Sequence, residues 1–188
     1  MTRGIYLDNN ANTRVDPAVV EAMLPFFTEQ FGNPSSLHQY GNQVGMALNR
    51  ARQQVQALLG AENDSEIIFT SCGTESDSTA ILSALGAQPE RKEIITTPVE
   101  HPAVLALCEH LEKEGYKVHR LKVDGKGCLD MREYMGLLSE RVAVVSVMWA
   151  NNEAGTLFPV EEMAELARSA GILFHTDAVQ AVGKLPID

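Results

Sequence analysis

The feature that most constrains the fold is a regular alternation of short apolar segments with helical segments between residues 66 and 175. The apolar segments are 66–71 (EIIFTS), 93–97 (EIITT), 116–121 (YKVHRL), 142–149 (VAVVSVMW) and 172–175 (ILFH), and the helical ones lie near 75–85, 102–114, 131–138 and 160–170. Strands that alternate with helices form a mostly parallel sheet with helices on both faces. The pattern therefore predicts a three-layer α/β fold.

The first sixty residues predict two helices ahead of this alternation. Asp16 is expected to cap a helix that has Pro17 at its first position, and Pro25 is expected to kink or end that helix. Apolar residues then recur at helical spacing as far as Gly60, which is expected to end the second helix. The chain has 188 residues, 45% of them hydrophobic, which is enough for one substantial core.

Charge and cysteine content exclude several classes of partner. The formal net charge of −10 argues against nucleic acid and against an anionic membrane. No secretion signal is visible in the first residues, and the longest apolar run, 142–150, is too short to span a bilayer. Three widely spaced cysteines predict a reduced, cytoplasmic chain with neither a disulfide framework nor a metal site.

Ligands of parallel α/β sheets bind at the carboxyl ends of the strands, so the residues that follow each strand are the candidate site. After the first strand, Gly73 allows a tight turn, and Thr74 with Asp77 has the spacing of a capping box. The start of this helix would suit a phosphate, although an ordinary capped helix explains the same residues. Cys72 could be a nucleophile, but a lone cysteine is more often a small buried residue that fills space, and Cys72 is interpreted as such.

The other strand ends carry an imidazole, amides and a carboxylate. His101 could stack on a flat ligand or move protons, or it could simply cap the helix that follows. The adjacent amides of Asn151 and Asn152 could bind a ligand or only form a loop. Asp177 follows the last strand, where a buried carboxylate without a partner would cost about 3–5 kcal/mol. Helix capping by Thr176 or Asp177 remains an alternative.

Taken together, these residues suit a flat, phosphorylated ring that can be protonated. Pyridoxal phosphate is such a ring, because its phosphate needs a helix N-terminus and its pyridine nitrogen needs a carboxylate. A carboxylate at Asp177 would keep that nitrogen protonated and make the ring an electron sink.

The sequence resembles the cysteine desulfurases, which are fold-type I pyridoxal-phosphate enzymes of aminotransferase class V. The similarity runs from Ile5 to Asp188 and rests on YLDNNANT, FGNPSSLH, FTSCGTESD, VEHPAV, WANNEAGT and FHTDAVQAVGKLPID. The stretches SCGTESDSTAI and VSVMWANNEAGTLFP are most similar to the nitrogen-fixation branch, which supplies sulfur for nitrogenase iron–sulfur clusters. The resemblance implies that residues 1–16 are associated with a small domain and that residues 17–188 are part of the large cofactor-binding domain. It also implies that the sheet of this domain is incomplete at the C-terminus.

The resemblance also implies roles for single residues. Gly73 and Thr74 would bind the cofactor phosphate, and His101 would stack over the pyridine ring and help with proton transfer. The remaining implied ligands are Asp177 for the ring nitrogen, Gln180 for the phenolic oxygen and Asn152 beside the cofactor and the substrate carboxylate. The implied substrate is L-cysteine, whose sulfur passes to an enzyme cysteine as a persulfide and then to an iron–sulfur scaffold protein. The implied assembly is a homodimer.

Two departures from the family pattern stand out. Asn12 occupies a position where the family usually has threonine, near the cofactor entrance. The cofactor-binding lysine and the persulfide cysteine of the family are expected beyond residue 188, so this chain is interpreted as the N-terminal portion of a longer enzyme. Lys184 matches the VGKLPID stretch, in which the family uses the lysine structurally.

Other functions remain open. The chain could come from a related class V enzyme, such as a selenocysteine lyase or an aminotransferase, or it could bind the cofactor without turnover. A nicotinamide-binding domain has a similar strand pattern but is disfavoured, because SCGTES stands where G-x-G-x-x-G would be expected.

Overall fold

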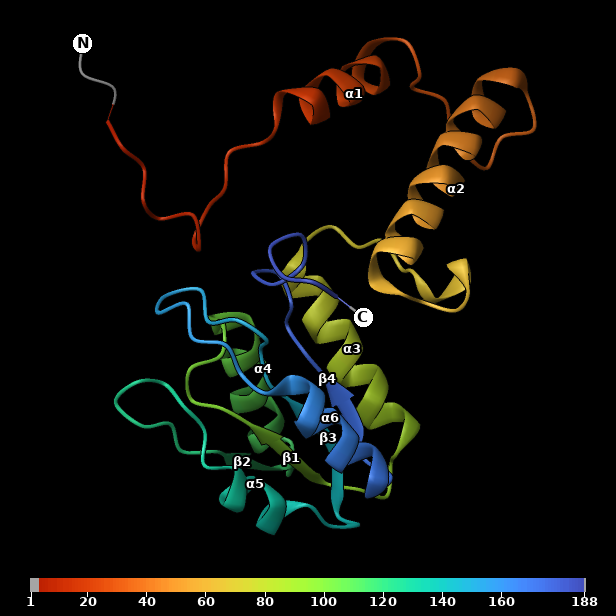
Figure 1. Cartoon of the computed structure of the whole chain (residues 1–188). Helices are drawn as coiled ribbons and strands as arrows, with labels where there is room; N and C mark the ends of the chain where they lie inside the picture. The colour runs from red at the N-terminus through yellow and green to blue at the C-terminus, as the bar shows by residue number, and fades with distance from the viewer. Residues whose placement is uncertain (1–3, 188) are drawn as a thin grey trace. The chain divides into compact units, whose positions relative to one another are not determined.

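The computed structural model describes residues 4–187, which divide into two compact units (Figure 1). The first unit extends to Phe69 and includes the residues from Pro186 onward, and the second unit is Thr70–Leu185. Every candidate site residue named above lies in the second unit. The domain division predicted at residue 16 stays a prediction.

The second unit is a parallel sheet between two layers of helices. Its four strands have the order β2-β1-β3-β4 and are β1 (Glu93–Thr96), β2 (Lys117–Arg120), β3 (Val142–Ser146) and β4 (Leu173–His175). The helices are α3 (Gly73–Ala87), α4 (Pro102–Lys113), α5 (Met131–Leu137) and α6 (Val160–Ser169). One core cluster joins the sheet to α3 and α4, and the other joins it to α5 and α6. The predicted three-layer α/β fold is therefore confirmed.

The residues of the central strands explain why both faces are covered. On β1, Ile94 packs toward α3 and α4, whereas Ile95 packs toward α5 and α6. The pairing of β1 with β3 is irregular at Ala143, so Ala143 and Val144 both join the α3–α4 cluster. Every residue of β1 and β3 is buried, while the outer strands β2 and β4 are partly exposed. Continuous apolar runs such as VAVVS are typical of strands buried on both faces.

One predicted strand, 66–71, is wrong. Asp64–Glu66 forms a short 3-10 helix (η1), and residues 67–70 have no regular secondary structure. Ile67 is buried, but Ile68 is 73% exposed. The backbone oxygen of Ile67 accepts a hydrogen bond from the Arg52 side chain rather than from a neighbouring strand. Apolar composition favours a strand, but a strand forms only where another backbone pairs with it.

The first unit contains the two predicted helices, α1 (Pro17–Thr28) and α2 (Gln39–Leu59). Asp16 caps α1 by accepting a hydrogen bond from the backbone of Ala18, and Pro25 lies within the helix instead of ending it. Gly60 ends α2 with a φ of 66°, a conformation that favours glycine. Within residues 4–187, no helix combines the length and the apolar character needed to cross a bilayer.

Candidate functional site

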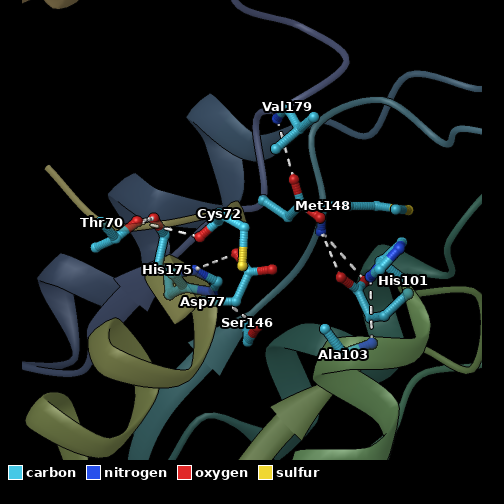
Figure 2. Close-up of polar contacts among 12 residues, drawn as sticks. Thr70, Cys72, Asp77, His101, Ala103, Ser146, Met148, His175 and Val179 are labelled. Carbon is cyan, nitrogen blue, oxygen red and sulfur yellow. Dashed lines mark hydrogen bonds and ion pairs between the residues drawn. The ribbon is translucent and has the colours of Figure 1, made fainter. Parts of the chain in front are cut away.

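The loops after β1, β3 and β4 and the start of α3 meet at one edge of the sheet (Figure 2). The Asn151 side chain, after β3, donates a hydrogen bond to the Val99 carbonyl, after β1, at 3.0 Å. The Trp149 amide donates to the Asp177 carbonyl, after β4, at 2.9 Å. A Cβ atom built on Gly73 would lie 3.4 Å from the Val179 side chain, so the start of α3 is in contact with the segment after β4. The structure thus brings the predicted strand ends together.

Helix α3 begins at Gly73, and its first turn differs from the predicted capping box. The N-cap residue is Cys72, whose side chain forms no capping hydrogen bond within the described residues. The Glu75 carboxylate instead accepts hydrogen bonds from the backbone and hydroxyl of Ser71, at 2.7 and 2.5 Å. The predicted pairing of Thr74 with Asp77 is wrong, because the Asp77 side chain lies on the buried side of α3 and contacts His175 on β4.

Cys72 is exposed, so its interpretation as a buried space-filling residue is wrong. The backbone N–H of Glu75 lowers the pKa of the Cys72 thiol, and the Ser71 hydroxyl, 3.7 Å from the sulfur, acts in the same direction. Amide groups at the start of a helix stabilise negative charge. The same groups that lower this pKa also make the start of α3 suitable for an anion.

A polar chain that the sequence analysis missed lies beneath α3. The Asp77 carboxylate is 3.5 Å from Nε2 of His175, and Nδ1 of His175 is 2.9 Å from the Ser146 hydroxyl. Figure 2 shows the three side chains next to one another. The available signal was that Ser146 is a polar residue inside the apolar segment 142–149 and that His175 is the last residue of the segment 172–175. This chain of contacts joins α3 to β4 and β3.

His101 is exposed and caps helix α4. Its Nδ1 atom accepts a hydrogen bond from the Ala103 amide at 3.2 Å, so a neutral ring carries its proton on Nε2. The alternative that His101 caps helix α4 is therefore confirmed. A role in stacking or proton transfer stays a prediction, and Nε2 is the atom left to perform it.

Glu100, directly before His101, is a buried carboxyl that the sequence analysis did not single out. Its Oε1 atom accepts a hydrogen bond from the Thr97 hydroxyl at 2.6 Å, and the Met148 amide donates to both carboxyl oxygens, at 3.2 and 3.0 Å. Burial raises the pKa of Glu100 to about 7. Only the fold reveals this group, because glutamate before a helix usually lies on the surface.

The adjacent amides Asn151 and Asn152 have different environments. Asn151 is buried, and its side-chain oxygen accepts hydrogen bonds from the backbones of Glu153 and Ala154 at 3.0 and 2.8 Å. Asn152 is partly exposed, and its amide donates a hydrogen bond to the Glu153 side chain at 3.2 Å. Asn151 therefore fixes the loop, and Asn152 remains the candidate for binding a ligand.

The Asp177 carboxylate lies in the loop after β4 and is 9% exposed. Its Oδ1 atom accepts a hydrogen bond from the Val179 amide at 3.0 Å, a contact within a turn. The alternative interpretation, capping of a helix, is wrong, because residues 178–185 form turns and no helix. The contact with Val179 leaves Oδ2 for another partner. Further along the same segment, the Gln180 side-chain oxygen accepts a hydrogen bond from Lys184.

Comparison with known proteins gives consistent matches along the whole chain. The sequence profile of the family "Aminotransferase class-V" matches residues 5–188. Cysteine desulfurase NifS of Azotobacter vinelandii is 77% identical over 184 residues, which are 98% of this chain and 46% of that protein. A solved structure titled "NifS-like protein" has a TM-score of 0.92 and 41% identity, covering 98% of this chain and 51% of its own. Another, titled "SspA in complex with cysteine", has a TM-score of 0.91 and 34% identity, covering 97% of this chain and 53% of its own.

These matches confirm the resemblance to cysteine desulfurases. The class V aminotransferases and the cysteine desulfurases among the matches are pyridoxal-phosphate-dependent enzymes. The chain spans about half the length of the curated relatives it matches. Because the family profile covers nearly every residue, the chain belongs to the aminotransferase class-V family.

Proposed function

We propose that the protein to which this chain belongs is a pyridoxal-phosphate-dependent cysteine desulfurase. The reaction removes sulfur from L-cysteine, leaves alanine and places the sulfur on an enzyme cysteine as a persulfide. The observation that carries the proposal is the 77% identity to a cysteine desulfurase over 98% of this chain. A solved neighbour whose title includes bound cysteine supports the choice of substrate.

The residues at the sheet edge fit the cofactor chemically. The start of α3 has no capping hydrogen bond from its N-cap side chain within the described residues, which leaves backbone N–H groups for a phosphate. The Thr176 hydroxyl, next to Asp177, is buried without a hydrogen-bond partner among the described residues. Buried polar atoms normally have a partner, so this hydroxyl is suited to a ligand that supplies one.

The proposed roles follow from the donor and acceptor atoms. Gly73 and Thr74 would bind the phosphate, and Oδ2 of Asp177 would pair with the pyridine nitrogen. Lys184 uses the oxygen of Gln180, so the amide NH2 of Gln180 would donate to the phenolic oxygen. Bound there, the cofactor would supply an electron sink.

His101 and Asn152 would act on the substrate side of the site. The hydrogen bond from Ala103 to Nδ1 of His101 keeps the ring proton on Nε2, so Nε2 would give or take the proton that moves. Asn152 would bind the substrate carboxylate through its amide. We propose a catalytic role for His101 and a binding role for Asn152.

The test is cofactor binding and sulfur release by the whole protein. We expect Asp177→Asn to lose the cofactor absorbance band and to abolish formation of sulfide and alanine from L-cysteine. Glu161→Gln, an exposed change on α6, is the matched control and should leave both unchanged. Normal desulfuration by Asp177→Asn would contradict the proposed role of its carboxylate.

We also propose the partners and the setting of the reaction. The sulfur acceptor would be an iron–sulfur scaffold protein, and the name NifS of a relative supports a link to nitrogen fixation. A homodimer is proposed because the resemblance to the cysteine desulfurases implies one. Exposed free thiols at Cys72 and Cys128 support a reducing cytoplasmic compartment.

A further inference from the structure

The proposed chemistry leaves the buried carboxyl of Glu100 without a role. Glu100 is 4% exposed and precedes His101 directly, in the loop between β1 and α4. Its hydrogen bonds with the Thr97 hydroxyl and the Met148 amide join this loop to the segment that follows β3. The backbone that carries His101 is therefore attached to the sheet one residue before the imidazole.

The same segment after β3 also holds Asp177. The Met148 amide donates to Glu100, and the next amide, that of Trp149, donates to the Asp177 carbonyl at 2.9 Å. Figure 2 shows Met148 between His101 and the Val179 turn, whose amide donates to the Asp177 carboxylate. Consecutive amides thus contact the residue before His101 and the backbone of Asp177.

We propose that Glu100 is a positioning residue, which holds the His101 imidazole in place relative to the Asp177 carboxylate by anchoring the β1–α4 loop to the end of β3. The inference rests on the proposed function, since it assigns Glu100 a role toward the same cofactor. Glu100 acts through His101 and the loop.

Burial of the Glu100 carboxyl opposes its ionisation, whereas the hydrogen bonds from Thr97 and Met148 favour the charged form. Burial raises its pKa to about 7, and the negative charges of Asp177 and Asp77 act in the same direction. Asp77, on α3, is in turn close to His175 on β4. Oε1 accepts from both Thr97 and Met148, so a glutamine oxygen in the Oε1 position can keep these two contacts and loses the contact of Met148 with Oε2 alone. Glutamine should therefore replace Glu100 functionally, whereas alanine should not.

The test compares Glu100→Ala, Glu100→Gln and the exposed α4 control Glu109→Ala in the whole protein by amide hydrogen exchange and by pyridoxal phosphate titration. In Glu100→Ala, exchange at the Met148 and Ala103 amides should rise about tenfold or more, with the Val144 amide in β3 unchanged. Pyridoxal phosphate should bind at least about tenfold more weakly to this variant. Glu100→Gln should stay within about threefold of wild type for both measurements, and Glu109→Ala should match wild type.

Several outcomes would decide the matter. Unchanged exchange at Met148 and Ala103 in Glu100→Ala would overturn the inference, and so would equal weakening of cofactor binding by alanine and glutamine. If wild type binds no pyridoxal phosphate while these amides still lose protection, the proposed function fails and the anchoring role stands. If Glu100→Ala does not fold, Thr97→Val removes one of the anchoring contacts. If Thr97→Val does not raise hydrogen exchange at the Met148 amide, the inference is wrong.

Discussion

The adjacent residues Asn151 and Asn152 allow a sharp test of how the loop after β3 is held. Replacing Asn151 by alanine removes the hydrogen bond to the Val99 carbonyl and the two that its side-chain oxygen accepts from Glu153 and Ala154. The Val99 carbonyl would then lose a partner in a partly buried position, at a cost of about 1–3 kcal/mol. Water can replace the contacts to the exposed residues, which contribute about 1 kcal/mol together. We expect a total loss of about 2–4 kcal/mol in the free energy of unfolding.

Asn152→Ala is the matched control, because the same side chain is removed one residue later. Asn152 contacts the exposed Glu153 side chain, so its loss should change the free energy of unfolding by less than about 0.5 kcal/mol. Urea unfolding followed by circular dichroism measures both variants, and hydrogen exchange at the Ala154 amide reports the loop directly. Equal losses in the two variants, or a loss below about 0.5 kcal/mol for Asn151→Ala, would refute this reasoning.

Three further predictions concern the pH dependence and the core. Burial raises the pKa of Glu100 from 4.5 to about 7, so the unfolded chain releases this proton at a lower pH than the folded chain. The contribution of Glu100 to the free energy of unfolding is therefore complete below pH 4.5 and falls by about 3 kcal/mol as the pH rises through 7. Urea unfolding across this range should show that slope in wild type and not in Glu100→Gln; parallel curves would contradict it. Hydrogen bonds from His119 and Arg141 lower the pKa of Glu93, so the contribution of Glu93 to the free energy of unfolding is present above pH 4.5 and is lost on acidification. In acid denaturation, Glu93→Gln should therefore lose less stability than wild type. Tyr134→Phe removes the buried hydrogen bond to the Met163 carbonyl and should cost about 1–2 kcal/mol in thermal unfolding, whereas no change would mean that this bond contributes little.

The sequence alone was sufficient for the architecture of the second unit. The alternation of apolar and helical segments predicted β1 to β4 and α3 to α6, because burial on both faces of a sheet leaves continuous apolar runs. Local capping was readable where donor and acceptor are near neighbours, as for Asp16 and for Gly60. Both signals can be read from residues that are close together in the sequence.

Tertiary structure decided what each polar group contacts. Asp77 has the spacing of a capping partner, yet it contacts His175, which is 98 residues further along the chain by number, and Glu75 forms the cap with Ser71. The apolar segment at 66–71 has strand character but pairs with no strand in the described chain. Sequence periodicity reports which face of an element is buried. It does not report which distant atoms come within hydrogen-bond distance of one another. Such contacts distinguish Asn151, whose side chain holds the loop, from Asn152. They also give the Glu100 carboxyl its buried partners.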